Sequence, residues 1–182
     1  DGARVDLLRD NQEVVQQYTY PSHAAAVRRG LVVWWPFESS VEDVGNHRMK
    51  LYLVQPCVFS NEYGGALVTG NQGFAYTEDN PAIRPVRRLT ICLWVWTAGY
   101  KSTTDRVQCI LSTSEKNMGV ALYRLGDSLS AFVRFEGDSE ATRVSTKSVL
   151  QGQSHNNRWV HVALVYDRQS LRVYVDGSVS VT

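Results

Sequence analysis

The sequence predicts a mainly β protein, in which two antiparallel sheets pack face to face as a jelly-roll sandwich preceded by a short N-terminal helical lead-in. From residue 31 onward, short runs rich in Val, Ile and aromatic residues are separated by Gly, Asn, Asp and Ser, which is typical of strands and turns. Several runs alternate between apolar and polar residues, the pattern of a half-buried strand. No long helical pattern interrupts them, and many short strands with little helix favour a sandwich or jelly roll.

Residues 1–30 differ from the rest and are expected to form a helical N-terminal extension. Asp6 is suited to cap a helix there. The apolar residues of this segment recur at helical spacing and are Leu7, Leu8, Val14, Val15 and Tyr18. A further helical turn is predicted over residues 23–27, with Gly30 ending it.

Residues 31–182 are expected to form the sandwich domain. The predicted strands cover residues 31–35, 51–54, 66–69, 74–77, 89–96, 107–112, 119–124, 129–135, 142–146, 159–166, 171–175 and 178–182. In one of them, Leu129, Ala131, Val133 and Phe135 share one face, while Ser130, Phe132 and Arg134 take the other. The runs 89–96 and 159–166 are apolar on both faces, which predicts central strands whose outer face is covered, so that Trp94 and Trp159 are shielded from water.

The strongest local turn signal is Asp176–Gly177, because an Asp-Gly pair readily adopts the positive φ angles of a two-residue type I′ hairpin. The sequence thus predicts a tight hairpin between the last two strands.

Composition excludes several classes of protein. The chain has 182 residues, 19 basic and 18 acidic, for a net charge of +1, which excludes a strongly basic nucleic-acid binder. No apolar run approaches the roughly 18 residues that a membrane span requires. The length is that of about one domain by the usual range of ~100–200 residues.

Three cysteines, Cys57, Cys92 and Cys109, cannot all pair within one chain, and their spacing matches no zinc motif. The prediction is that Cys92 and Cys109 are small buried residues. A bridge between these two, on adjacent strands, is the alternative.

Several motifs occur in the order of one known family. Residues 159–167 read W-V-H-V-A-L-V-Y-D and residues 171–177 read L-R-V-Y-V-D-G. Earlier matches read W-P-F at 35–37, D-V-G-N at 43–46, G-A-L at 65–67 and L-T-I-C-L-W-V at 89–95. From about residue 31 to its end, the chain resembles the laminin-G-like, concanavalin A-like lectin and glucanase domains. His161 is interpreted as a packed sheet histidine, because no Ser, Cys or second His lies within five residues of it in the sequence.

The chain departs from this family at its end, where further strands that would follow the Asp-Gly hairpin are missing. We therefore expect a truncated sandwich, a lead-in that substitutes for the missing strands, or a partner chain that completes the sheet by strand addition.

The resemblance also suggests an enzyme, because glycoside hydrolases of this fold carry three alternating acidic residues on one strand. Glu136, Asp138 and Glu140 match that spacing. The residues between them are Gly137 and Ser139, which favour a solvated turn over a strand, so we do not expect catalysis.

Two sets of side chains are candidates for ligand binding. Asp43 and Asn46 offer hard oxygen ligands for calcium, which laminin-G-like domains often hold at a loop rim. Guanidinium groups suit sulfate, carboxylate or phosphate, and a tyrosine ring beside a loop suits a sugar. The residues of this second set are Arg84, Arg87, Arg88 and Tyr100.

The sequence therefore predicts a non-catalytic recognition domain that binds a protein or a glycan as part of a larger protein or assembly, with no required cofactor. A structural subunit that completes its sheet with a partner chain is the first alternative, and a glycoside hydrolase the second. The resemblance suits an extracellular or cell-surface location, and an intracellular scaffold is the alternative.

Overall fold

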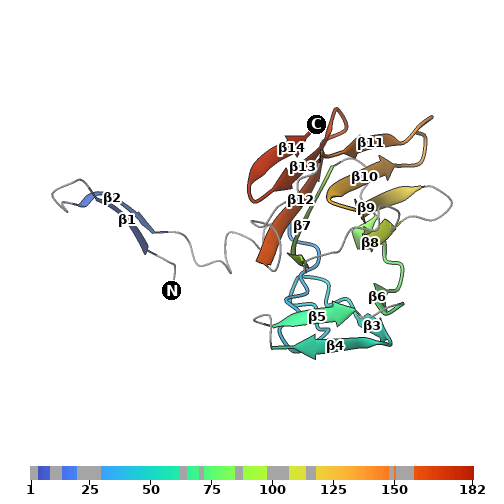
Figure 1. The fold of residues 1–182 in the computed structure, drawn as a ribbon, viewed down its shortest axis with the longest axis horizontal. Helices are drawn as coiled ribbons and strands as arrows, with labels where there is room; N and C mark the ends of the chain where they lie inside the picture. Colours follow the sequence, from blue (N-terminus) through green and yellow to red (C-terminus); the bar gives the residue numbers. More distant parts are fainter. Residues whose placement is uncertain are drawn as a thin grey trace. The chain divides into compact units, whose positions relative to one another are not determined.

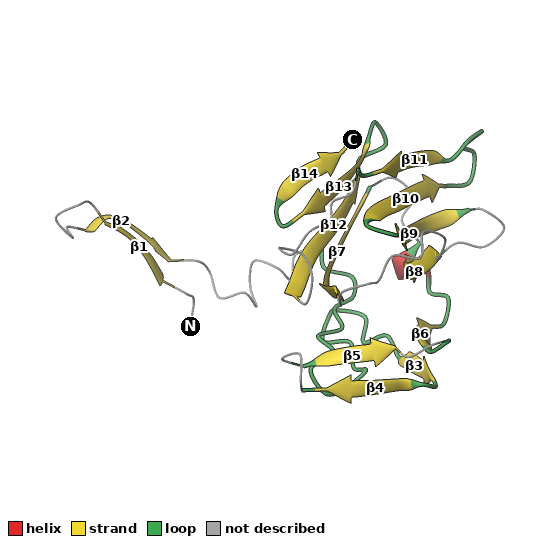
Figure 2. Ribbon diagram, in the orientation of Figure 1, coloured by secondary structure: helices red, strands yellow, loops and turns green. Residues whose placement is uncertain are grey.

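The structure, a computed structural model, describes residues 4–8, 14–19, 30–61, 65–69, 72–84, 88–97, 107–113, 118–147, 150 and 158–182. The chain divides into two compact units, residues 1–83 and residues 84–182. In the described ranges the one helical segment is a short 3-10 turn, η1 (Pro81–Ile83), and all other regular elements are strands (Figure 2). No helix of the described residues is long and apolar enough to span a membrane.

The second unit contains the predicted strands from residue 89 onward, each to within a residue or so of its expected ends. They are β7 (Leu89–Thr97), β8 (Val107–Ser112), β9 (Gly119–Leu125), β10 (Ser128–Arg134), β11 (Thr142–Ser145), β12 (Arg158–Tyr166), β13 (Leu171–Val175) and β14 (Ser178–Val181). These strands form two four-stranded antiparallel sheets, with the orders β11-β10-β9-β8 and β14-β13-β12-β7 (Figure 1). The mainly β, two-sheet fold class is confirmed.

One apolar core lies between these two sheets. Leu129, Ala131 and Val133 of β10 are at most 3% exposed, which confirms their predicted shared inner face. Val160, Val162 and Leu164 of β12 are at most 1% exposed and face them from the other sheet. The inner residues of both sheets form a single cluster, so their burial holds the sandwich together.

The predicted hairpin is confirmed at the end of the chain. Asp176 has a φ of 49° and Gly177 a φ of 79°, and Val175 pairs with Ser178 across the two-residue turn. Both positive φ values are those that a type I′ turn requires.

The first unit contains shorter strand pairs. β3 (Leu51–Val54) pairs with β6 (Phe74–Thr77), and β4 (Cys57–Ser60) pairs with β5 (Ala66–Thr69). The sequence did not predict β4. It predicted a strand over residues 31–35, which is wrong, because the structure assigns no strand there: the Trp34 N–H bonds to the Asp43 carboxylate and the Leu31 carbonyl to the Asn46 amide.

The predicted helix at the N-terminus is also wrong. The structure places β1 (Arg4–Leu8) and β2 (Val14–Thr19) there, paired antiparallel, with Val5 opposite Tyr18. The β-branched residues Val5, Val14 and Val15 favour extended backbone, and this preference outweighs the helical spacing of the apolar residues. The second helical turn, predicted over residues 23–27, lies outside the described residues.

The expected shielding of Trp94 is wrong. Its side chain is 63% exposed, because it lies on the outer face of β7, and β7 is the last strand of its sheet among the described residues. Its ring centroid lies 5.0 Å from that of His161, opposite it on β12. Trp159 is half-buried, with its ring 5.6 Å from the Trp96 ring. His161 is therefore a sheet histidine packed on an aromatic ring, as interpreted.

Two of the cysteines are exposed rather than buried. Cys92 lies opposite Ala163 on the outer face of β7, and Cys109 lies opposite Tyr123 in the other sheet. All three cysteines are free, so the alternative bridge between Cys92 and Cys109 does not form.

Candidate functional site

The loop that connects β10 to β11, residues 135–141, carries several polar side chains and contributes to two hollows of the second unit. It is a closed turn: the Asp138 carboxylate accepts a hydrogen bond from the Phe135 N–H at 2.8 Å, and the Asp138 N–H donates to the Phe135 carbonyl at 3.1 Å. Gly137 has a φ of 91°, a conformation that favours glycine. These contacts fix the loop at the rim of the sandwich.

Two hollows flank this loop, one on each side. The larger has a volume of about 380 Å³ and is lined by Arg134, Ser139, Glu140, Ala141 and Arg143. The smaller has a volume of about 260 Å³ and is lined by Phe135, Glu136, Asp138, Tyr166 and Arg168.

The three acidic residues whose spacing matches that of a glycosidase do not line the same hollow. Glu140 lines the larger hollow, whereas Glu136 and Asp138 line the smaller one. All three are exposed and lie in the turn rather than on a strand, and Asp138 uses its carboxylate to close that turn. The prediction of a solvated turn is confirmed, and the three carboxylates do not converge on one cleft as a glycosidase pair must.

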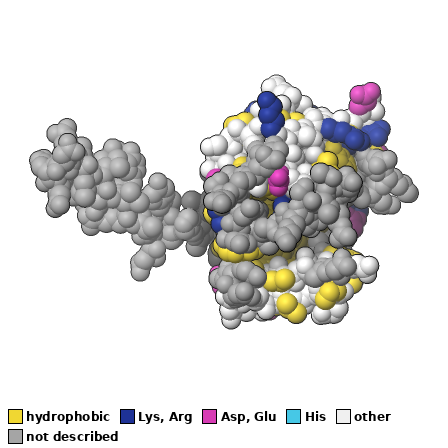
Figure 3. All heavy atoms as spheres, viewed as in Figure 1, with side chains coloured by type: hydrophobic (Ala, Val, Ile, Leu, Met, Phe, Trp, Pro, Cys, Tyr) yellow, Lys and Arg dark blue, Asp and Glu magenta, His cyan; other side chains and the backbone are white. Residues whose placement is uncertain are grey.

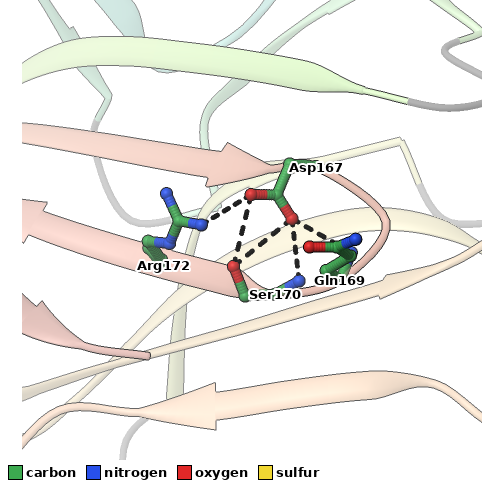
Figure 4. A network of polar contacts seen from close by, with 4 residues as sticks. All are labelled: Asp167, Gln169, Ser170 and Arg172. Atoms are coloured by element: carbon green, nitrogen blue, oxygen red, sulfur yellow. Dashed lines mark hydrogen bonds and ion pairs between the residues drawn. The ribbon is translucent and has the colours of Figure 1, made fainter.

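The smaller hollow is bordered by the hairpin between β12 and β13, which a carboxylate network fixes (Figure 4). One oxygen of Asp167 accepts hydrogen bonds from the backbone N–H groups of Ser170 at 2.8 Å and Gln169 at 3.0 Å, and the other bonds to Arg172 at 2.6 Å. The backbone donors Ser170 and Gln169 lower the pKa of Asp167, and the Arg172 charge adds to this effect. The hairpin therefore presents Arg168, in a left-handed conformation with φ of 75°, from an ordered turn.

The larger hollow lies at the end of a polar and aromatic row on the outer face of β9, β10 and β11. The rings of Tyr123 and Phe132 are stacked with centroids 6.3 Å apart, and the Arg143 guanidinium lies 5.8 Å from the Phe132 centroid. Arg134 follows Phe132 on the same face and donates to the Ser139 carbonyl at 3.3 Å. The row places two arginines beside one hollow.

The calcium candidates lie in the first unit. Asp43 is 7% exposed, and its two oxygens accept hydrogen bonds from the backbone N–H groups of Trp34, Gly45 and Met49 at 2.7–2.8 Å. Asn46 donates its side-chain amide to the Leu31 carbonyl at 2.8 Å. Among the described residues, no three His, Cys, Asp or Glu side chains group as metal ligands. Calcium binding by Asp43 and Asn46 stays a prediction.

The predicted basic patch is described only in part. Arg84 and Arg88 are exposed, whereas Arg87 and Tyr100 lie outside the described residues. Anion binding by this patch also stays a prediction.

The sequence reasoning did not select Arg134, Arg143 or Phe132 as site residues. Alternation along 128–134 places Phe132 and Arg134 on the outer face, but only strand pairing shows that Arg143 lies opposite Phe132. This alternation places an arginine and an aromatic residue on one solvent face, but such a pair does not by itself identify a site.

The fold matches those of several solved structures at low sequence identity. The binding domain of botulinum neurotoxin DC, solved in complex with rat synaptotagmin II, is 10% identical with a TM-score of 0.66, over 85% of this chain and 39% of that one. A structure of botulinum neurotoxin type C, whose cell entry depends on two ganglioside molecules, is 10% identical with a TM-score of 0.68, over 87% and 40%. The serotype D/C VPI 5993 binding domain is 9% identical with a TM-score of 0.68, over 86% and 40%.

These matches show the fold, and the chain spans about two fifths of the length of each of those structures. No curated protein matches the sequence. The family model described as the concanavalin A-like lectin/glucanases superfamily, of the laminin G type, matches residues 69–181, which is more than half of the chain. The resemblance found in the sequence is thus confirmed over residues 69–181, and the chain belongs to the concanavalin A-like lectin/glucanases superfamily.

Proposed function

We propose that this chain is a non-catalytic recognition domain, which binds a glycan or protein ligand at the rim of its sandwich. One observation carries the proposal: the hollows beside the loop 135–141 are lined by charged side chains, yet the acidic residues divide between them. Such lining suits binding of a polar ligand. It does not supply the paired carboxylates that a glycosidase of this superfamily needs.

The related solved structures support the same class of function. Two of them are binding domains of botulinum neurotoxins, one solved in complex with rat synaptotagmin II, and the third is of botulinum neurotoxin type C, whose cell entry depends on interaction with two ganglioside molecules. Because this chain covers about two fifths of each, their ligands are carried over only as classes, a protein or the glycan of a ganglioside. Function on such folds resides in rim loops that differ between members.

An assay of sugar release separates recognition from catalysis. The chain is incubated with soluble β-glucans, and reducing ends are measured alongside a Glu136→Gln/Glu140→Gln variant. We expect no release by either protein. Release by the wild type that the double substitution abolishes would show that the carboxylates act together, and would overturn the proposal.

The second candidate is a structural role, in which the sandwich packs against a partner chain. It is favoured by the outer face of the sheet β14-β13-β12-β7, where Trp94 is 63% and Val179 56% exposed and Cys92 is also exposed. Light scattering of the purified chain distinguishes the two roles. A stable monomer supports a free-standing recognition domain, whereas concentration-dependent association that Trp94→Ser relieves supports the structural role.

A further inference from the structure

We infer that the larger hollow binds the carboxylate or sulfate group of an acidic saccharide through Arg134 and Arg143. This inference rests on the recognition function proposed above and names its ligand class and its site. Three features carry it: two guanidinium groups directed to one hollow, the absence of an ion pair for either among the described residues, and an aromatic row next to them.

The two arginines come from neighbouring strands. Phe132 pairs with Arg143 across β10 and β11, and Arg134 follows two residues further along β10, so that both side chains lie on the same outer face. Both line the hollow of about 380 Å³. A basic group of side chains is visible in Figure 3 at the side of the second unit where β11 lies in Figure 1. Two planar guanidinium forks at one hollow match an oxyanion, which accepts several hydrogen bonds at once.

Local contacts hold each guanidinium in place. The Arg143 guanidinium lies over the Phe132 ring, 5.8 Å from its centroid, in a cation–π contact. Arg134 donates to the Ser139 carbonyl at 3.3 Å, and its Nε is buried with no hydrogen-bond partner in the described part of the chain. A buried donor without an acceptor is unfavourable, so a small shift of this side chain toward an arriving oxyanion is favoured.

The hollow also contains one acidic side chain, Glu140. Two arginines against one glutamate leave a net positive charge at the site, which favours an anion over a neutral or cationic group. Because Glu140 opposes that preference, its removal has the opposite effect on affinity from removal of the arginines.

The aromatic row favours a saccharide as the carrier of the charge. Tyr123 and Phe132 are half-buried, so each keeps part of its ring in solvent on the face that leads to Arg143. Beyond them, the Ser130 and Ser145 hydroxyls are hydrogen-bonded to each other at 2.8 Å on the same face. Aromatic rings next to hydroxyl groups offer a surface that a pyranose ring can cover with its apolar and polar sides.

Titration calorimetry on the full chain tests the inference with 3′-sialyllactose, a heparin hexasaccharide and neutral lactose. We expect an acidic saccharide to bind and lactose not to bind. Arg134→Gln/Arg143→Gln should weaken binding at least about tenfold, or about 1.4 kcal/mol. Glu140→Gln should strengthen it. Binding of heparin alone identifies sulfate as the anion, and binding of sialyllactose identifies carboxylate.

The matched control is Arg48→Gln/Lys147→Gln, which removes the same charge from exposed residues that line neither hollow and should change affinity less than about twofold. Arg134→Lys/Arg143→Lys keeps the charge and should recover only part of the binding. Thermal melting of each variant checks that it is folded.

Three results would overturn the inference in different ways. Binding that survives Arg134→Gln/Arg143→Gln but is lost in Arg84→Gln/Arg87→Gln/Arg88→Gln places the anion at the sequence-predicted patch and leaves glycan recognition standing. Equal binding of lactose and sialyllactose, or no saccharide binding by the folded wild type, rejects the acidic-saccharide site. The absence of any saccharide binding by the folded wild type would also argue against a glycan as the ligand in the proposed function.

Discussion

Asp43 is a buried carboxylate that organises an irregular segment of the first unit. Burial by itself raises the pKa of its carboxyl group. Hydrogen bonds from the backbone N–H groups of Trp34, Met49 and Gly45, together with the charge of His47, outweigh burial, and the pKa is lowered below its ordinary value. The segment 31–35, which the structure assigns to no strand, is tied to the rest of the unit by this side chain, by the Asn46 amide on the Leu31 carbonyl and by the Val44 N–H on the Trp34 carbonyl at 2.9 Å.

Substitution of Asp43 by Asn should lower the free energy of unfolding by about 1–3 kcal/mol near neutral pH, because three backbone N–H groups lose a charged acceptor whose oxygens are buried. The native carboxyl has a lower pKa than the unfolded one, so its contribution is fully present above about pH 4 and is lost as pH falls through the native pKa. Urea denaturation followed by tryptophan fluorescence at several pH values measures this difference, which should shrink in acid.

The neighbouring Glu42 is exposed and provides the control, since Glu42→Gln should change stability by less than about 0.5 kcal/mol. Equal effects of the two substitutions would contradict the role of Asp43. Thermal melting with excess calcium or with a chelator also tests the calcium prediction. A calcium-dependent rise in melting temperature that Asp43→Asn abolishes would support it.

At the scale of an element, the hairpin between β13 and β14 combines a turn and an anchor. Asp176 adopts the left-handed conformation of the turn, and its carboxylate accepts a hydrogen bond from the His161 N–H at 3.0 Å. The other carboxylate oxygen pairs with Arg158 at 2.6 Å, with both side chains more than a third exposed. The turn residue thus ties the hairpin to β12, a role that the turn motif alone does not show.

Asp176→Ala should lower the free energy of unfolding by about 1–2 kcal/mol, because alanine adopts a left-handed conformation at a cost of that size. Asp176→Asn should have a much smaller effect, since asparagine tolerates this conformation and keeps a side-chain oxygen for the His161 N–H. The loss of the partly exposed ion pair adds little in either variant. Chemical denaturation compares the two, and similar losses would show that the ion pair, rather than the turn, stabilises the hairpin.

At the scale of the whole chain, the exposure of the three cysteines shows which strand faces are open to solvent. Cys92 and Cys109 are exposed in different sheets of the second unit, whereas Cys57 in the first unit is 3% exposed and donates its thiol to the Val54 carbonyl at 3.0 Å. Partial burial raises the pKa of both exposed thiols. They should therefore be accessible but less reactive than a small free thiol, because the thiolate is the reacting species.

We expect Ellman's reagent to modify two thiols in the native protein, more slowly than it modifies free cysteine, and the third only after denaturation. Cys92→Ser and Cys109→Ser should each remove one of the native reactions. Modification of Cys57 at the same rate as the others would contradict its burial, and failure of Cys92 to react would show that its outer face is covered.

Local patterns in the sequence are sufficient to predict the fold class, most strands and the last turn of this protein. Those features depend on local information: alternation along 129–133 marks an inner face, and Asp176–Gly177 specifies its own turn. The sequence also identified Glu136, Asp138 and Glu140 as a turn, because Gly137 and Ser139 are unsuited to a strand that faces a core. The helical interpretation of residues 1–30 failed where apolar spacing and β-branched preference disagreed.

Which side chains lie next to one another on neighbouring strands depends on the tertiary structure. That Arg143 lies opposite Phe132, that Glu140 faces a different hollow from Glu136, and that Trp94 faces solvent all depend on strand pairing and strand order. Strand pairing joins residues that are far apart in the chain. The two-residue period of a strand shows on which face a residue lies, but not which residue lies beside it on the next strand. For this reason the composition of the rim, on which recognition depends, is a property of the folded sandwich.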